Sequence, residues 1–200
     1  MKRWLAVLST LVAVFAAAPA WAQEDADVDS SAVMLVARPV LGADPIYSSS
    51  ILIARPLPNG GHVGFILNKP TTAKLGDVFP EHGPSQKVVD PVFLGGPNDI
   101  NVVFALVERR DPANERELRI APDLFLAVEA KDVDHVIESE SDHARVFVGM
   151  VVWKPGELDV EMERGLWYTL QPDAKIVLDK HPDKLWEQLV RKGKDREHMI

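Results

Sequence analysis

The sequence contains no cysteine among its 200 residues. Disulfide bonds, catalytic thiols, cysteine-ligated metals and lipid attachment through an N-terminal cysteine are therefore excluded. Histidine occurs six times, but without the His-x-His or His-Glu-x-x-His spacing of common metal sites. Phosphate-binding loops, dinucleotide fingerprints and the Gly-x-Ser-x-Gly elbow of hydrolases are missing as well. We therefore expect neither a metal nor a cofactor.

Positive charge is also scarce. The chain has 22 lysines and arginines against 30 aspartates and glutamates, which gives a net charge of −8. Lys2 and Arg3 are the charged residues among the first 22, so a chain cleaved after Ala22 would carry a net charge of −10. Such a chain is a poor general ligand for nucleic acid or for an anionic membrane surface. We expect no nucleic-acid partner.

The chain has one long, mostly apolar run, at residues 5–18. It follows a basic start and precedes Ala20-Trp21-Ala22, which fits the small-x-small cleavage rule. A membrane-spanning helix needs about 20 apolar residues, so a stable membrane anchor is the weaker alternative. Residues 1–22 are therefore predicted to be a signal peptide, cleaved near Ala22, and the protein is predicted to be periplasmic or secreted.

The rest of the chain is predicted to form a single domain. Residues 23–32 are acidic and polar, which is typical of a flexible leader. Residues 33–192 have the length of one domain that can bury its own core. Residues 193–200 are polar and are expected to fray.

Short apolar runs between glycine, proline and asparagine turns predict strands, and apolar positions at helical spacing predict helices. The strands are expected at residues 32–37, 50–55, 63–67, 91–94, 101–108, 118–121, 124–128, 144–153, 166–170 and 176–178. The helices are expected at residues 73–79, 131–140, 157–165 and 183–192. Because the two kinds of element alternate irregularly, we expect an α+β fold with a largely antiparallel sheet. Trp153, Trp167 and Trp186 are expected in the core.

Two of these strands end in polar turn motifs. Residues 63–67 run into Asn68-Lys69-Pro70-Thr71, and residues 91–94 run into Gly95-Gly96-Pro97. Pro70 lacks a backbone N–H and cannot continue a central ladder. If the two strands are neighbours that enter from the same side, both motifs lie at one edge of the sheet.

Two interpretations of this edge are open. In the first, paired glycines expose N–H groups to a small anion or a protein partner, and Lys69 adds positive charge. In the second, the same residues only shape tight turns. The binding residues of the first interpretation are Asp44, Asn68, Lys69, Thr71, Gly95 and Gly96.

An enzymatic alternative, of hydrolase type, combines His62 with Asp44 and Asn68, because imidazole exchanges protons near neutral pH. It requires the three side chains to converge within hydrogen-bond reach. Otherwise His62 is a hairpin residue that faces solvent. Residues 132–135 (Asp-Val-Asp-His) indicate an acidic helix start rather than a metal site, and the serines at 48–50 indicate a loop.

Four motifs occur in an order and at spacings that resemble the YqgE/AlgH family. They are residues 35–39 with 44–47, residues 64–71, residues 93–97, and residues 149–153 with 156–158 and Trp167. Together they span roughly residues 33–191. The resemblance implies an α+β fold with a strongly bent sheet, in which a small barrel-like core is flanked by short helices.

The resemblance implies no reaction. One family member is named for alginate regulation and some are labelled transcriptional regulators, which makes a DNA-associated regulator a third alternative. This alternative fits poorly with export and with the acidic charge. The family is normally cytoplasmic, so the export signal is a departure, and Tyr47 stands where an aromatic residue without a hydroxyl is usual. The oligomeric state, including a homodimer, is left open.

Overall fold

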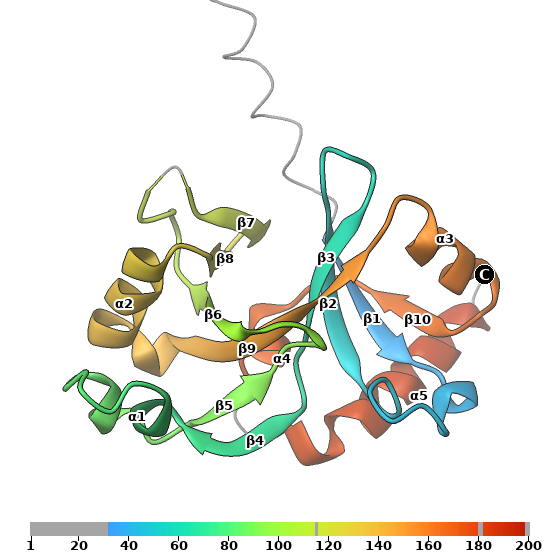
Figure 1. Ribbon diagram of the computed structural model, residues 1–200. Coiled ribbons are helices and arrows are strands. Elements are labelled where there is room, and N and C mark those ends of the chain that lie inside the picture. Colours follow the sequence, from blue (N-terminus) through green and yellow to red (C-terminus); the bar gives the residue numbers. More distant parts are fainter. Residues whose placement is uncertain (1–31, 115, 180–181, 199–200) are drawn as a thin grey trace, which may run out of the picture.

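The computed structural model describes residues 32–114, 116–179 and 182–198. These residues form one strongly curled, ten-stranded sheet with short helices around it (Figure 1). The sheet has the shape of a half-barrel, and the expected α+β class is confirmed. The predicted signal peptide, residues 1–22, lies outside the described residues, as does the leader up to residue 31.

The elements follow one another in mixed order, as labelled in Figure 1. The strands are β1 (Val33–Ala37), β2 (Ile51–Pro56), β3 (His62–Ile66), β4 (Pro70–Lys74), β5 (Pro91–Leu94), β6 (Asn98–Glu108), β7 (Leu118–Ala121), β8 (Leu124–Ala127), β9 (Ala144–Trp153) and β10 (Trp167–Leu170). The α-helices are α1 (Leu75–Val78), α2 (Ala130–Ser139), α3 (Glu157–Glu163), α4 (Ala174–Val177) and α5 (Leu185–Glu197). The 3-10 turns are η2 (Pro39–Leu41), η3 (Ser85–Lys87), η4 (Ser141–His143) and η5 (Pro182–Lys184).

The main path of the sheet runs β10-β1-β2-β3-β9-β6-β8-β7. Every pairing along it is antiparallel, and β4 joins β5 in the same way. The pairing of β5 with β9 is parallel. The sheet curls far enough for β2 to touch β7, because Arg55 Nε donates a hydrogen bond to the backbone oxygen of Arg119 at 3.1 Å.

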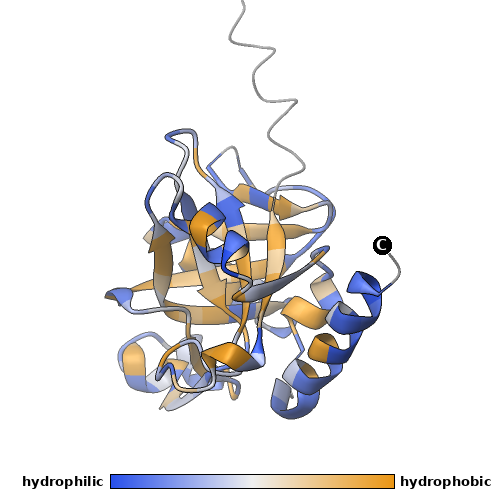
Figure 2. Ribbon diagram, turned by 90° about the vertical axis from the view of Figure 1, so that its right-hand side faces the viewer, coloured by the Kyte–Doolittle hydropathy of each residue, from blue (hydrophilic) through white to orange (hydrophobic). Residues whose placement is uncertain are grey.

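Three clusters of buried side chains hold the half-barrel together. The largest fills its concave side, where the rings of Phe65, Phe104 and Phe147 meet and α5 adds Leu189. A second cluster packs α3 against the outside of β1, β2 and β3, and a third packs α1 and α2 against β6, β8 and β9. Figure 2 shows the hydrophobic residues gathered on the strands.

The expected core position of the tryptophans is confirmed for two of them. Trp153 and Trp167 are each 4% exposed. Their indole N–H groups donate to the same carboxylate oxygen, Glu161 Oε2 on α3, at 3.1 and 2.8 Å. Trp186 is partly buried against the main core and donates to the backbone oxygen of Ala37 at 2.8 Å. The buried indoles therefore have the partners that such groups require.

The helix expected at residues 73–79 is confirmed for residues 75–78, but its start is wrong. Residues 70–74 form the edge strand β4, and α1 covers Leu75–Val78 alone. Thr71 does not cap a helix. Its hydroxyl donates to the backbone oxygen of Val92 on β5 at 2.7 Å. Two adjacent threonines favour an extended chain, and here the neighbouring strand decides the outcome.

The strand expected at residues 176–178 is wrong as well. These residues belong to α4 and its C-terminal end, because Asp173 caps the helix by accepting from the backbone N–H of Lys175 at 2.9 Å. A short apolar run does not by itself distinguish a strand from a buried helix.

The last helix is longer than expected. α5 continues to Glu197, so the tail that was predicted to fray from residue 193 is helical as far as that residue. Gly193 does not end the helix. It lies against the ring of Tyr168, where an added Cβ would come within 2.6 Å of Cγ. Within the described ranges, no helix is both long and apolar enough to cross a membrane.

Candidate functional site

The two polar turn motifs do lie side by side. The backbone N–H of Leu94 donates to the oxygen of Lys69 at 2.9 Å, and the N–H of Ile66 donates to the oxygen of Gly95 at 2.8 Å. The end of β3 and the end of β5 therefore lie together at one edge.

Gly95 and Gly96 form a crossing rather than an open loop. Phe147 and Val148 of β9 pair with β5 on one side and with β6 on the other. The chain must therefore pass over β9 between these two strands. A Cβ added to Gly95 would lie 2.2 Å from the backbone oxygen of Gly149. A Cβ added to Gly96 would lie 2.3 Å from the carbonyl group of Met150. Glycine is needed because backbone lies against backbone.

At this crossing, a backbone N–H group that the anion-binding interpretation needs is already used in a hydrogen bond. Both glycines are buried, and the N–H of Gly95 already donates to the oxygen of Val148 at 2.8 Å. Lys69 is half-buried beside them. Anion binding at this edge stays a prediction, to which the geometry of the two glycines adds no support.

The remaining predicted binding residues stabilise the local backbone. Asn68 Oδ1 accepts from the N–H of Ile51, and its Nδ2 donates to the oxygen of Ser49, both at 2.8 Å. Asp44 Oδ1 accepts from the N–H groups of Ile46 and Tyr47 at 2.8 and 2.7 Å. These contacts are the ones that the turn-shaping interpretation requires.

His62 is not brought to Asn68. It begins β3 and pairs with Trp153, whereas Asn68 follows the other end of the same strand. The extended chain from His62 to Ile66 alone spans about 13 Å, at about 3.3 Å per residue. This separation exceeds hydrogen-bond reach, even through one water. The set of His62, Asp44 and Asn68 is therefore not assembled.

Sequence reasoning missed Arg145, which lies behind this edge. It is 4% exposed, and its Nη1 donates to the oxygen of Leu67 at 2.6 Å. Its Nη2 donates to the oxygen of Asp179, and its guanidinium lies 4.2 Å from the ring centre of Phe93. Burial lowers the pKa of Arg145 to about 10, against the opposing effect of Asp179 and then Asp90. One arginine within the apolar run 144–153 was the available signal.

Arg145 also lines a small apolar cavity between β5, β9 and α2. The cavity holds about 20 Å³, which is room for about one water molecule. Its size argues for a packing defect rather than a ligand pocket.

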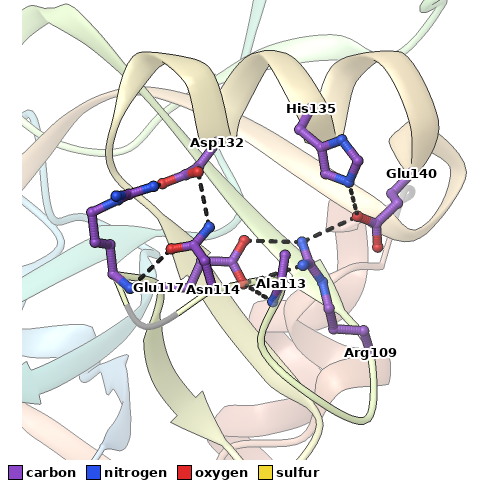
Figure 3. Close-up of polar contacts among 8 residues, drawn as sticks. Arg109, Ala113, Asn114, Glu117, Asp132, His135 and Glu140 are labelled. Carbon is purple, nitrogen blue, oxygen red and sulfur yellow. Dashed lines mark hydrogen bonds and ion pairs between the residues drawn. The ribbon is translucent and has the colours of Figure 1, made fainter.

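A group of ion pairs joins the β6–β7 connection to α2 (Figure 3). Arg109 Nη2 lies 3.1 Å from Glu117 Oε1 and 3.2 Å from Glu140 Oε1. Asn114 Nδ2 donates to Asp132 Oδ1 at 2.9 Å. Because cationic side chains lie between its carboxylates, this cluster holds the β6–β7 connection in place. In the part of the chain that the structure describes, no three His, Asp or Glu side chains are placed to share a metal ion.

Residues 132–135 lie in α2, whose side chains diverge here. Asp132 faces Asn114, and His135 Nε2 lies 3.7 Å from Glu140 Oε1. Asp134 is exposed on another side of the helix.

An open groove of about 660 Å³ lies between α1, with the loop after it, and the N-terminal half of α2. Its apolar lining comes from Val78, Phe79, Val102, Val103, Val128 and Val133. The polar residues of its lining are His82, Asn101 and Asp134. Val78 and Val102 are 37% and 42% exposed, which is unusual for large aliphatic side chains that lie close together.

His82 connects the two walls of this groove. Its Nδ1 lies 2.7 Å from Ser85 Oγ at η3, and its Nε2 lies 3.5 Å from Glu138 Oε1 on α2. His82 thus lies between the α1 wall and the α2 wall. We call the space between them the α1–α2 groove.

A second open groove, of about 690 Å³, lies between α5 and the residues after β10. Most residues of its lining are polar and carry both signs of charge, with Asp173, Arg191 and Asp195 among them.

Comparisons with known proteins agree with this fold. The sequence profile of a family described as AlgH-like matches residues 34–196. The chain belongs to the AlgH-like family. Among related sequences, a UPF0301 protein of Saccharophagus degradans is 30% identical over 163 residues, which cover 78% of each chain. A UPF0301 protein of Chlorobaculum tepidum is 26% identical over 74% of this chain and 79% of its own.

Two solved structures have the same AlgH-like fold. The solution structure of the AlgH protein from Pseudomonas aeruginosa has a TM-score of 0.65 at 21% identity, and the match covers 82% of this chain and 90% of that one. A crystal structure of a Corynebacterium diphtheriae protein has a TM-score of 0.64 at 19% identity, over 84% and 91%. At these identities the likeness shows the fold alone. The family resemblance expected from the motifs is confirmed.

Proposed function

We propose that this AlgH-like chain is an exported binding module, which recognises a protein partner through the α1–α2 groove. The observation that carries the proposal is the groove itself, where exposed Val78 and Val102 adjoin a larger apolar lining. Apolar surface of this kind, with polar groups at its border, is typical of sites where proteins bind partners.

The Asn68-Lys69-Pro70-Thr71 edge contributes to this proposal mainly as a scaffold. β4 starts at Pro70 and leads directly into α1, which forms one wall of the groove. Thr71 fixes the position of β4 by its bond to Val92, and Asn68 fixes the loop before β2. The motif thus determines the position of α1 and of the groove wall that α1 forms.

A random peptide library displayed on phage tests the groove on the chain that starts at residue 23. Selected peptides are expected to shift the backbone NMR signals of Val78, Val102 and Val133. Val102→Glu is expected to weaken their binding at least about tenfold, because a buried charge opposes apolar contact. Val40→Glu is the matched control, since Val40 is 70% exposed at η2.

Signals that move at Lys69, Gly95 and Gly96 instead, together with loss of binding in Lys69→Ala, would place the site at the predicted edge. Selected peptides that bind Val102→Glu as tightly as the parent protein would reject the groove as the site.

Export rests on the sequence pattern of residues 1–22 and has its own test. We expect cell fractionation to recover the protein outside the cytoplasm, with Gln23 as its first residue by N-terminal sequencing. Recovery of the full-length chain in the cytoplasm would reject export and would return the DNA-associated alternative to consideration.

A further inference from the structure

We infer that the segment recognised by the α1–α2 groove is an extended peptide chain, in which an apolar residue and a lysine or arginine lie two positions apart. The inference rests on the function proposed above and specifies the partner of that same site. Charge around the groove and the open edge of β6 support it.

The border of the groove is acidic. Asp134 lines the groove, and Glu138, one helical turn further along α2, is exposed and reaches His82 on the opposite wall. Glu81 adjoins His82 on that wall, in a surface hollow that continues from the groove. In the described chain, neither lysine nor arginine lines the groove or this hollow. An apolar floor with an acidic border is complementary to an apolar segment that carries cations.

The strand β6 offers a backbone edge at the same place. β8 pairs with β6 from Ala105 to Glu108, and the chain then turns at Val128 toward α2. Beyond Ala105, residues 101–103 of β6 line the groove, and within the described ranges no strand pairs with them on the β8 side. An unpaired strand edge accepts an added strand through main-chain hydrogen bonds.

The spacing of the recognised residues follows from this geometry. Side chains two positions apart on a strand point to the same face. An apolar residue that packs on Val103 and Val133 therefore places the side chain two positions away on the helix side of the sheet. A long cationic side chain there reaches toward Asp134 and Glu138, which stand on that side.

Three synthetic peptides test the charge preference directly. The first has the sequence Thr-Val-Thr-Val-Thr-Lys-Thr, and in the other two glutamate or glutamine replaces the lysine. Fluorescence anisotropy with the chain that starts at residue 23 is expected to show at least about tenfold tighter binding of the lysine peptide than of the glutamate peptide. The difference should shrink as salt is added, because exposed charges are screened.

Two changes separate the parts of the inference. The double variant Asp134→Lys with Glu138→Lys is expected to reverse the order of the lysine and glutamate peptides, and circular dichroism checks that it remains folded. Both residues are exposed, so the fold does not depend on them. A lysine peptide with N-methylated backbone at its central residues is expected not to bind, since it cannot pair with β6.

Each outcome has a distinct meaning. Equal binding of the three unmethylated peptides would overturn the charge preference and leave the proposed groove intact. Undiminished binding of the methylated peptide would overturn the extended mode. Binding by none of the peptides, when library peptides still bind at Val102, would overturn this inference alone. If neither the synthetic peptides nor the library peptides bind, the proposed function is overturned as well.

Discussion

Arg145 places a charge inside the half-barrel, where its guanidinium is the donor for two backbone carbonyls. We expect Arg145→Ala to lower the free energy of unfolding by about 3 kcal/mol, because the oxygens of Leu67 and Asp179 would lose a charged donor in a buried place. Urea denaturation measures this loss. Arg164→Ala is the matched control, since Arg164 is exposed, and its effect should stay within about 0.5 kcal/mol. Equal effects would show that Arg145 is dispensable.

Tyr47 has a consequence for alkaline stability. Burial, then the charges of Glu161 and Asp44, raise the pKa of its hydroxyl above the usual 10.0. Above about pH 10 the hydroxyl of Tyr47 therefore loses its proton in the unfolded chain before it does so in the native state. The unfolded chain then binds fewer protons than the native state, which stabilises it relative to the native state. The native state accordingly loses stability as pH rises through this range.

The prediction is that Tyr47→Phe removes this loss. The difference in unfolding free energy between variant and parent should move in favour of the variant from about pH 9 to about pH 11. Denaturant titrations at these pH values and at neutral pH measure it. A difference that is the same at every pH would contradict the assignment. The edge contact of the ring with Trp167, at 6.0 Å between centroids, should remain in the variant.

The crossing of the β5–β6 connection over β9 leaves no room for added side chains. We expect Gly96→Ala to destabilise the fold by about 3 kcal/mol or more, because the added Cβ meets the backbone of Met150 and no side-chain rotation relieves it. Gly83→Ala is the control. Its Cβ would meet open space, so its unfolding free energy should stay within about 1 kcal/mol of the parent. Thermal unfolding of both variants checks the contrast.

Elements whose own sequence specifies them were predictable. The strand at 144–153 and the buried face of α2, with Val133, Val136 and Ile137, follow from residue spacing alone. β4 did not, since Thr71 forms its deciding bond with Val92, a partner that only the folded chain supplies. The crossing over β9 was not predictable either, because two adjacent glycines indicate a turn as readily as they indicate a close approach of two backbones.

The α1–α2 groove was beyond prediction for a related reason. Its lining comes from three separate segments, at residues 78–82, 101–103 and 128–134. Each segment by itself reads as ordinary amphipathic structure. The apolar character of the site arises only where the three meet, whereas Asn68 and Lys69 drew attention because their motif is compact.

The helix α5 completes the main core although it comes last in the chain. Leu189 is 4% exposed in the same cluster as Met34 of β1 and Leu170 of β10. We expect Leu189→Ala to lower the unfolding free energy by about 3 kcal/mol. Near-ultraviolet and far-ultraviolet circular dichroism should report one shared transition, because α5 and the sheet form one cooperative unit. Separate transitions would contradict this, and Gln188→Ala, at an exposed neighbour, is the control.

The passage of the chain over β9 also constrains the order of folding. β5 and β6 are consecutive, yet the strand that lies between them is made only after residues 109–143. Until β9 emerges, β6 lacks its main partner and β5 is paired with β4 alone. Loop closure over such separations makes folding slow. The growing chain therefore cannot complete the pairing of β5 and β6 until residues 144–153 have been made. For a protein that is exported as proposed, this delay keeps the chain unfolded, and so able to be translocated, until it has crossed the membrane.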